Sequence, residues 1–486
     1  MNLKDQSPQN EKPVSIPKIQ TRIRGLDDIL YGGLPAQRTT IISGTAGTGK
    51  TVLAMEFLYQ GALEGKPGIF ISFEESAEGL RVNASGMGMD IENLENAGKL
   101  KVILAELPRD AVLAGEFDTM GLLAMIEGHA AMIGADRIVL DAIDVLMWIF
   151  DDPTRERKEI YLMLEKLKDL GLTNILTVKV DPVGRRVYPF LDFMADCVLF
   201  LDQRMCNQVR TRRLNVVKYR GSNFMSNEHP YVLSEQGFSA IPISSMDLSQ
   251  FPYAERLSTG HDKLDQMLNG GILKSSTVLL AGPSGSGKTS LACIFAHAAC
   301  SRGEKVLYVD FEVAGEVLIS GVQSIGLDMR PALENEIRLH IMTLMPESLG
   351  PEQHLLKIID EINQFAPNHL VVDAISACRR MGGEQAAFDF IFRLMSMCKA
   401  RGITCIFTNQ TTGVEHVTEI SGIGVSSLVD AIITLEYYFS EKKMKRQLMV
   451  LKSRGSAHSL DYCQMQITDS GIRLCDEPVI NSKSNA

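Results

Sequence analysis

Residues 40–58 read Thr40-Ile41-Ile42-Ser43-Gly44-Thr45-Ala46-Gly47-Thr48-Gly49-Lys50-Thr51-Val52-Leu53-Ala54-Met55-Glu56-Phe57-Leu58, and this stretch decides the fold. An apolar run precedes the glycine-rich segment and a helix-patterned run follows it, which is the strand–loop–helix setting of a phosphate-binding loop. The glycines let consecutive backbone N–H groups surround a phosphate, and the start of the helix adds its positive dipole end. The pattern predicts that Lys50 reaches the β- and γ-phosphates of a nucleotide and that Thr51 ligates Mg²⁺.

The same pattern returns at residues 282–289 as Gly282-Pro283-Ser284-Gly285-Ser286-Gly287-Lys288-Thr289. Two chance matches in one chain are improbable, so the sequence predicts a duplicated nucleoside triphosphatase. Matched residues recur at nearly constant separations: 238 for Lys50 and Lys288 and for Gly33 and Gly271, 232 for Asp141 and Asp373, and 234 for Lys218 and Lys452. The loop residues predicted to bind nucleotide are Gly44, Gly47, Thr48, Gly49, Lys50, Thr51 and Val52 in the first half and Gly282, Ser284, Gly285, Ser286, Gly287, Lys288, Thr289 and Ser290 in the second.

Apolar runs alternate with helical patterns in each half. In the first half they lie at residues 69–73, 102–104, 137–141, 174–178 and 197–201. Continuous apolar strands separated by helices, such as the one predicted over 156–171, favour a mostly parallel sheet covered on both faces. The more alternating segments 213–219 and 231–233 suggest antiparallel strands at one edge. We predict an α/β fold with two tandem P-loop NTPase domains, each a mostly parallel sheet flanked by helices.

The repeat also predicts the domain organisation. The expected parts are a disordered tail over residues 1–19, a first domain over 20–243, a linker over 244–252, a second domain over 253–476 and a polar tail over 477–486. The tail and linker are rich in polar residues and proline, which cannot build a core.

Composition limits the classes of function. The chain has 486 residues, 45% of them hydrophobic, and a net charge of −10, which argues against an unaided electrostatic grip on nucleic acid. No apolar run reaches the ~18 residues of a membrane span. The first residues carry no signal-peptide pattern, and the nine cysteines show no zinc spacing, so we expect a cytoplasmic protein with reduced, packed thiols.

An apolar strand is predicted to end in aspartate in each half, at Asp141 and Asp373. A carboxylate at that place, beside the phosphate loop, can hold Mg²⁺ through water. Alone, such an aspartate is more often a helix cap or turn residue. Two copies at matching distances from the loops favour the metal role, so the predicted metal residues are Thr51, Asp141, Thr289 and Asp373.

Glu74 and Glu75 follow the strand predicted over residues 69–73. Hydrolysis needs a base that orients water in line with the γ-phosphate, and a glutamate at a strand end suits that position. The alternative is a solvated acidic turn at the start of a helix. In the second half we align Phe311 with Glu74 and Glu312 with Glu75, which predicts unequal chemistry at the two sites. The residues predicted to be catalytic are Glu74, Glu75, Glu312, Lys50 and Lys288.

A cationic segment, Lys218-Tyr219-Arg220-Gly221-Ser222, recurs as Lys452-Ser453-Arg454-Gly455-Ser456, each with an arginine six positions before its lysine. Strand alternation places the lysine and arginine on one face, which suits the γ-phosphate bound by a neighbouring subunit. The alternative is an edge strand that positive charge protects from aggregation. The residues predicted here to bind nucleotide are Lys218, Tyr219, Arg220, Ser222, Lys452, Ser453, Arg454 and Ser456.

These motifs, with Arg24-Gly25-Leu26-Asp27-Asp28-Ile29-Leu30-Tyr31-Gly32-Gly33-Leu34-Pro35 and Phe73-Glu74-Glu75-Ser76, resemble the double-domain KaiC proteins, which are RecA-like ATPases known from the bacterial circadian clock. The resemblance covers residues 23–474. It implies two RecA-like domains, a homo-hexamer with ATP and Mg²⁺ at the subunit interfaces, slow ATPase activity in the first domain, and serine/threonine autokinase activity in the second.

The resemblance also assigns roles to single residues. Glu74 falls where the family's lytic-water glutamate sits, and the two cationic segments, extended to His458, fall where residues contact the neighbour's nucleotide. Ser426 and Ser427 match the family's adjacent phosphorylation sites. Without the resemblance, a Ser-Ser pair after two glycines suggests a turn.

Two departures from the family pattern bear on function. The alignment above puts Phe311 where the family has the base of its autokinase step. The sequence also stops soon after Leu474, without the longer segment through which KaiA regulates clock proteins. We therefore expect a timekeeper with a KaiB-like partner, or a homologue that serves stress response or signalling.

Two further classes of function stay open. A RecA-type DNA-dependent ATPase would share the fold, and residues 210–213 and 442–446 supply basic hairpin ends, but the acidic chain disfavours it. A scaffold whose second domain only binds ATP would explain Phe311.

Overall fold

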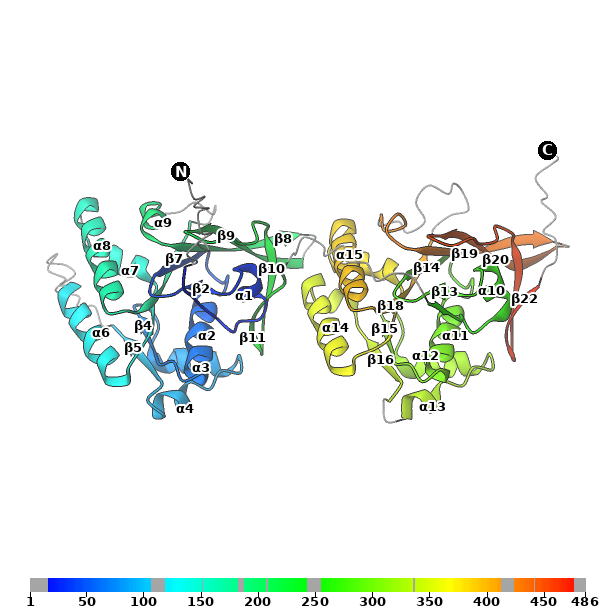
Figure 1. Cartoon of the computed structure of the whole chain (residues 1–486), viewed down its shortest axis with the longest axis horizontal. Coiled ribbons are helices and arrows are strands. Elements are labelled where there is room, and N and C mark those ends of the chain that lie inside the picture. Colours follow the sequence, from blue (N-terminus) through cyan, green and yellow to red (C-terminus); the bar gives the residue numbers. More distant parts are fainter. Residues whose placement is uncertain are drawn as a thin grey trace, which may run out of the picture. The chain divides into compact units, whose positions relative to one another are not determined.

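The computed structural model describes residues 16–105, 119–150, 152–181, 188–206, 209–242, 255–334, 337–411, 424–440 and 442–475. The chain forms two compact units, the first ending at Ser244 and the second beginning at Ser245. Each unit has a nine-stranded sheet with helices on both faces (Figure 1).

The sheet of the first unit has the order β11-β10-β9-β8-β3-β7-β6-β4-β5. Its strands are β3 (Thr39–Gly44), β4 (Gly68–Ser72), β5 (Leu100–Leu104), β6 (Arg137–Asp141), β7 (Thr173–Lys179), β8 (Cys197–Cys206), β9 (Val209–Tyr219), β10 (His229–Ser234) and β11 (Gly237–Ala240). Strands β3 to β8 are parallel, whereas β10 pairs antiparallel with both β9 and β11. The mostly parallel sheet with an antiparallel edge, predicted from the sequence, is confirmed.

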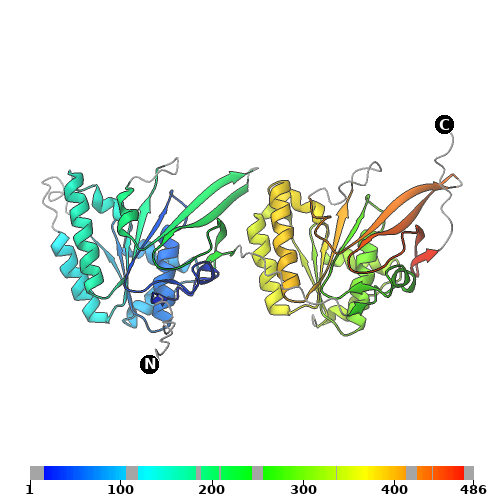
Figure 2. The same cartoon turned by 45° about the horizontal axis from the view of Figure 1, so that its top comes forward.

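The helices of the first unit are α1 (Leu26–Ile29), α2 (Lys50–Leu63), α3 (Ala77–Ser85), α4 (Ile91–Asn96), α6 (Thr119–Ile133), α7 (Ile143–Met147), α8 (Pro153–Asp169) and α9 (Phe190–Met194). Figure 2 shows α6 and α8 on one side of the sheet and α2 on the other. Neighbouring strand residues alternate between two cores, so that Ile42 and Phe70 pack on the α2 side while Ile41 and Ile69 pack on the other. Burial on both faces explains why these strands read as unbroken apolar runs.

The second unit repeats this plan in the order β16-β15-β17-β18-β14-β19-β20-β21-β22. Its strands are β14 (Thr277–Gly282), β15 (Val306–Asp310), β16 (Leu339–Thr343), β17 (His369–Asp373), β18 (Thr404–Gln410), β19 (Ala431–Ser440), β20 (Lys443–Ser453), β21 (Cys463–Thr468) and β22 (Gly471–Cys475). Its helices are α10 (Asp262–Met267), α11 (Lys288–Ser301), α12 (Gly315–Gln323), α13 (Arg330–Leu333), α14 (Pro351–Phe365) and α15 (Glu384–Ala400), with 3-10 turns η2 (Pro346–Ser348) and η3 (Ile375–Met381).

Short strand pairs precede each phosphate loop. In the first unit β1 (Lys18–Ile19) pairs with β2 (Leu34–Pro35), and in the second β12 (Arg256–Leu257) pairs with β13 (Ile272–Leu273). Lys18 and Ile19 therefore belong to the fold, which corrects the expectation that all of residues 1–19 are disordered. Residues 1–15 lie outside the described part of the chain.

Strand register corrects the alignment of the acidic segments. Ser72 pairs with Asp141 in the first unit and Asp310 pairs with Asp373 in the second, so Ser72 and Asp310 are equivalent. Counting onward, Phe311 corresponds to Phe73, Glu312 to Glu74, and Val313 to Glu75. The prediction that Phe311 replaces the first glutamate is wrong.

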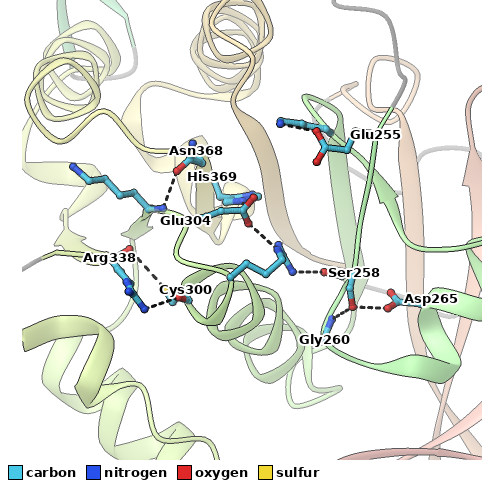
Figure 3. A network of polar contacts seen from close by, with 12 residues as sticks. Glu255, Ser258, Gly260, Asp265, Cys300, Glu304, Arg338, Asn368 and His369 are labelled. Carbon is cyan, nitrogen blue, oxygen red and sulfur yellow. Dashed lines mark hydrogen bonds and ion pairs between the residues drawn. The ribbon is translucent and has the colours of Figure 1, made fainter.

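A polar network ties the beginnings of strands β15 and β17 in the second unit to the segment before α10 (Figure 3). Glu304 accepts from Arg302 at 2.8 Å and lies 2.9 Å from His369 Nε2, and Arg302 also donates to the Ser258 carbonyl. Burial opposes ionisation of Glu304, but the hydrogen bonds and charges of His369 and Arg302 lower its pKa overall. These contacts hold the amino-terminal ends of β15 and β17 together. Because the two strands are parallel, their carboxyl ends meet at the opposite edge of the sheet, where the candidate site lies.

Candidate nucleotide sites

The phosphate loops join β3 to α2 and β14 to α11, as the sequence predicts. The residue before each helix is a glycine with positive φ, 90° at Gly49 and 103° at Gly287. A Cβ added there would lie 2.7 Å from Leu233 Cδ1 or 2.6 Å from Met465 Cε. Only glycine meets both the backbone and the space requirement.

The loop lysines lie inside the loops. Lys50 Nζ donates to the Gly44 and Thr45 carbonyls, both at 2.9 Å, and Lys288 Nζ donates to Gly282 at 2.9 Å and Pro283 at 2.8 Å. Burial lowers the pKa of both lysines, and the carboxylates beside them oppose that effect. A partly buried ammonium at the start of a 14-residue helix suits a polyphosphate.

The predicted metal carboxylates end strands β6 and β17 and are buried. Thr51 Oγ1 donates to Asp141 Oδ2 at 3.0 Å, and Thr177 donates to the other oxygen. Burial raises the pKa of Asp141, against the hydrogen bonds of both threonines. In the described residues no three His, Cys, Asp or Glu side chains gather into a metal site. One carboxylate, one hydroxyl and a phosphate-binding loop instead make the donor set that fits Mg²⁺ bound to a nucleotide.

The glutamates after β4 have different partners. Glu74 forms an ion pair with Lys179 at the end of β7, and both side chains are nearly half exposed. Partial burial lowers the pKa of Lys179, but the hydrogen bond and charge of Glu74 raise it overall. Glu75 accepts from Asn83 of α3, so it is held toward that helix.

Glu312 lies in the turn after β15, which Asp310 caps. Asp310 Oδ1 accepts from the backbone N–H groups of Glu312 at 2.8 Å and Val313 at 2.7 Å. Burial raises the pKa of Asp310 to about 6, against these two hydrogen bonds. Phe311 is buried against His354 and Phe390, with ring centroids 6.0 and 6.2 Å away. Phe311 is thus a core residue beside the site.

The two cationic segments make matching contacts within their own units. Lys218 Nζ donates to the Asp192 carbonyl at 2.5 Å, and Arg220 Nη2 donates to the Phe193 carbonyl at 2.7 Å. In the second unit Lys452 Nζ donates to Ser426 O at 3.0 Å, and Arg454 Nη2 donates to Ser427 O at 2.6 Å. Burial lowers the pKa of both lysines.

These contacts identify the first-unit counterparts of the two serines. Arg220 N donates to Asp196 O and Arg454 N donates to Asp430 O, each at 2.8 Å, which fixes the register. Counting back four residues from Asp196 and Asp430 matches Asp192 with Ser426, and Phe193 therefore matches Ser427. The first unit has no hydroxyl at these positions, and one of them is already acidic. The serines themselves lie in a turn.

The other residues predicted to bind nucleotide lie on the loop helices or in and after the cationic segments. Tyr219 is buried and its hydroxyl donates to Gly33 O at 2.9 Å, while Ser456 Oγ accepts from Arg256 at 2.5 Å. His458 Nδ1 lies 3.4 Å from Ser456 O. Val52 and Ser290 belong to the first turns of α2 and α11, Ser453 ends β20, and Ser222 Oγ donates to Asn223 O at 2.8 Å.

The structure also brings residues to the loops that the motifs did not indicate. Tyr231 OH donates to Thr48 O at 2.6 Å and Gln203 Nε2 donates to Ala46 O at 2.9 Å. In the second unit Tyr437 OH donates to Ser284 O at 3.2 Å and Arg446 Nε to Gly285 O at 3.1 Å. Gln203 and Tyr437 come from β8 and β19, the strands next to the loop-bearing strands β3 and β14, and Tyr231 and Arg446 come from the antiparallel strands β10 and β20. Of the four, Arg446 alone carried a sequence signal, its place six residues before Lys452.

No helix within the described ranges is both long and apolar enough to cross a membrane. The cysteines whose side chains are described are free, and Cys475 alone among them is exposed.

Comparison with known proteins extends these observations to the whole chain. The family model for the KaiC ATPase matches residues 19–245 and again 257–479. The chain is 35% identical over 471 residues to the circadian clock protein KaiC2 of Synechocystis sp., covering 96% of this chain and 83% of that one. It is 34% identical to the circadian clock oscillator protein KaiC of Acaryochloris marina (97% and 91% covered) and 33% identical to that of Synechococcus elongatus (96% and 91% covered). Both units match over nearly their full length, and the chain belongs to the KaiC family of ATPases.

Proposed function

We propose that the chain binds ATP with Mg²⁺ in both units, hydrolyses it in the first, and phosphorylates its own serines in the second. Lys50 and Lys288 would hold the phosphates, and Thr51, Asp141, Thr289 and Asp373 would hold the metal. The bound Mg·ATP supplies the phosphoryl group. Glu74 orients water and takes its proton in the first unit, while Glu75 supports the turn.

One observation carries this proposal: each parallel sheet brings a phosphate loop, an aspartate and a glutamate to the same edge. Glu74 and Glu312 share one register at that edge. Since Glu312 keeps the position of the first glutamate, a base is available in the second unit too. The scaffold alternative rested on Phe311 at this position, and it loses that support.

The acceptor follows from the contrast between the units. Ser426 and Ser427 offer hydroxyls where the first unit has Asp192 and Phe193, so a hydroxyl acceptor for phosphoryl transfer is present at these positions only in the second unit. Glu312 would take the proton from the serine hydroxyl.

We further propose that the chain works as a homo-hexamer in which Lys218, Arg220, Lys452, Arg454 and His458 complete the nucleotide sites of neighbouring subunits. The names of the relatives support a signalling ATPase of the clock type, with a KaiB-like partner or a role in stress signalling. Lys218 and Lys452 lie near the ends of two 11-residue strands, β9 and β20, at the antiparallel edge, and Arg220 and Arg454 follow directly after those strands. Both strands end level with the start of the strand that carries the phosphate loop, since Ser453 and Val278 both pair with Ala431. These cations therefore lie away from the phosphate loop of their own unit, which supports contact with a neighbour's phosphates.

The test uses Lys50→Ala and Lys288→Ala, alone and together, in the full chain. Each variant should bind nucleotide about 10- to 100-fold more weakly at its own loop, because a charged hydrogen-bond donor is lost. Lys50→Ala should remove most of the ATP hydrolysis, and Lys288→Ala should remove phosphate from the peptide with Ser426 and Ser427 in mass spectrometry after incubation with Mg·ATP.

Ser426→Ala/Ser427→Ala is the matched control, which should lose the phosphate but keep hydrolysis. Unchanged nucleotide affinity in the double lysine variant would sink the whole proposal. Missing phosphate in the parent chain would remove the autokinase alone. Tight, salt-sensitive binding of DNA would favour the DNA-dependent alternative.

A further inference from the structure

The carboxylate of Asp373 is held from within the core of the second unit. The Tyr308 hydroxyl donates to Asp373 Oδ2 at 2.9 Å, and Thr408 donates to Oδ1. Tyr308 lies on β15, is fully buried, and packs on the face that α11 covers. Cys293 of α11 lies against it, with its Sγ 3.9 Å from the Tyr308 oxygen. A phenol inside an apolar core thus has a carboxylate oxygen as its acceptor.

The first unit holds its matching carboxylate differently. Position 70 on β4 is phenylalanine, which the shared register makes the counterpart of Tyr308. There Asp141 Oδ2 accepts instead from Thr51, the hydroxyl of the phosphate loop. Across the described residues, the matching Thr289 makes no hydrogen bond to Asp373. The threonine under the other oxygen, Thr177 or Thr408, is common to both units.

We propose that Tyr308 is a positioning residue that fixes Asp373 for the divalent cation of the second nucleotide site, and that Thr51 has this task in the first. This inference rests on the proposed role of Asp373 in holding the metal. The tyrosine acts through the carboxylate and touches neither nucleotide nor metal. The two units therefore differ in what the loop threonine does: Thr51 serves the metal and also anchors Asp141, whereas Thr289 serves the metal alone.

Hydrogen bonds to a metal-binding carboxylate select its rotamer before the metal arrives. Losing such an outer partner costs roughly 10- to 100-fold in metal affinity. Without the Tyr308 hydroxyl, the buried Asp373 oxygen would also lose a hydrogen bond that offsets its desolvation. Phenylalanine at position 308 keeps the ring, and the first unit folds with phenylalanine at the matching place, so the core tolerates the change.

The experiment measures Mn²⁺ in place of Mg²⁺. Full-length protein carrying Lys50→Ala, which confines nucleotide to the second unit, is saturated with ADP, and free Mn²⁺ is followed by electron paramagnetic resonance. Adding Tyr308→Phe should weaken Mn²⁺ binding about 10-fold. ADP affinity in EDTA should stay within about twofold, because without metal the carboxylate has no ligand to orient. The control Cys293→Ala removes the neighbouring thiol, keeps the Tyr308 hydrogen bond, and should leave Mn²⁺ affinity unchanged.

A second measurement leaves Tyr308 intact. Thr51→Ala, measured in a Lys288→Ala background, should weaken Mn²⁺ binding about 10-fold more than Thr289→Ala does in the Lys50→Ala background, since it removes a ligand and an anchor together. Equal losses, or Mn²⁺ affinity within twofold of the parent in Tyr308→Phe, would overturn the inference. Asp373→Asn separates the two ideas: if it also leaves Mn²⁺ affinity unchanged, Asp373 is not a metal residue and the proposed site fails with the inference.

Discussion

The ion pair between Glu74 and Lys179 is the contact that most directly affects the proposed chemistry of the first unit. It joins the end of β7 to the turn after β4 and occupies a carboxylate oxygen of the residue proposed to take the proton from water. The second unit has Gln410 at the position of Lys179, because Lys179 pairs with Gly44 and Gln410 with Gly282. No cation therefore restrains Glu312 from this position.

Changing Lys179→Gln should raise ATP turnover in the first unit. Both partners are half exposed, so the contact is worth up to about 1 kcal/mol, which corresponds to roughly a fivefold rise. The measurement is kcat in a Lys288→Ala background, and Gln410→Lys in a Lys50→Ala background is the matched reverse. A lower kcat in Lys179→Gln would mean that the lysine orients Glu74 for catalysis.

The sequence identified the loops and the strand-end aspartates because each has a local pattern. It misplaced Glu312 because two carboxylates with one apolar neighbour can be aligned in either of two ways. The 238-residue offset of the loop lysines, applied to Phe311, gives Phe73 and the right answer. Lys179 and Tyr308 had no local signal: each acts on a residue far away in the chain, and Tyr308 lies in an apolar run.

At the scale of elements, α2 is tied to the antiparallel edge by a buried carboxylate. Glu56 accepts from the backbone N–H of Phe238 on β11 at 2.6 Å and is 5% exposed. A Cβ at Gly237 would lie 2.6 Å from Glu56 Oε2, so that position must stay small. Burial raises the pKa of Glu56 to about 7, against the hydrogen bond from Phe238. The helix that begins at the phosphate loop thus has a titratable anchor.

This anchor gives the first unit a pH-dependent stability. Below pH 4.5 Glu56 is protonated in both states, and between 4.5 and about 7 only the folded state keeps the proton. The stabilisation from protonated Glu56 is therefore complete below pH 4.5 and is lost as the pH rises through about 7. Relative to the parent, the free energy of unfolding of Glu56→Gln should rise by about 3 kcal/mol between pH 4 and pH 8.

Hydrogen exchange of the α2 amides across this pH range measures the effect within the first unit. Glu64→Gln, at the exposed glutamate directly after α2 that pairs with Arg22, is the control for the loss of a surface carboxylate. A difference between Glu56→Gln and the parent that stays constant with pH would contradict the assignment.

At the scale of the molecule, the two units share a strand order but differ in residues beside their candidate sites, with Lys179 in place of Gln410 and Phe70 in place of Tyr308. The repeat of apolar strands and helices was enough to predict both sheets, because burial on two faces leaves a strong mark in sequence. The antiparallel edge was predicted only in outline, since its loop contacts depend on single side chains such as Tyr231 and Arg446.

The contacts of the cationic segment predict which subunit becomes phosphorylated. Lys452 and Arg454 hold the turn of Ser426 and Ser427, so cations that reach a neighbour's nucleotide carry these serines with them. Mixing Lys288→Ala with Arg454→Ala should then restore phosphorylation that each variant lacks alone. The phosphate should appear on the Lys288→Ala chains, which still supply Arg454.

Labelling one variant with ¹⁵N lets mass spectrometry assign the phosphate to its chain. Phosphate on the Arg454→Ala chains would show transfer within a subunit, and no phosphate in any mixture would argue against nucleotide sites shared between subunits.

The match of Asp192 with Ser426 has a consequence for how the charge at this position can change over time. In the first unit the negative charge at this position belongs to the aspartate side chain and is present throughout the protein's lifetime. In the other half, the proposed autophosphorylation of Ser426 or Ser427 would have to add it. Any record of past ATP use that is kept as charge on this turn is therefore written in a single half of the chain, with the other half serving as a fixed reference.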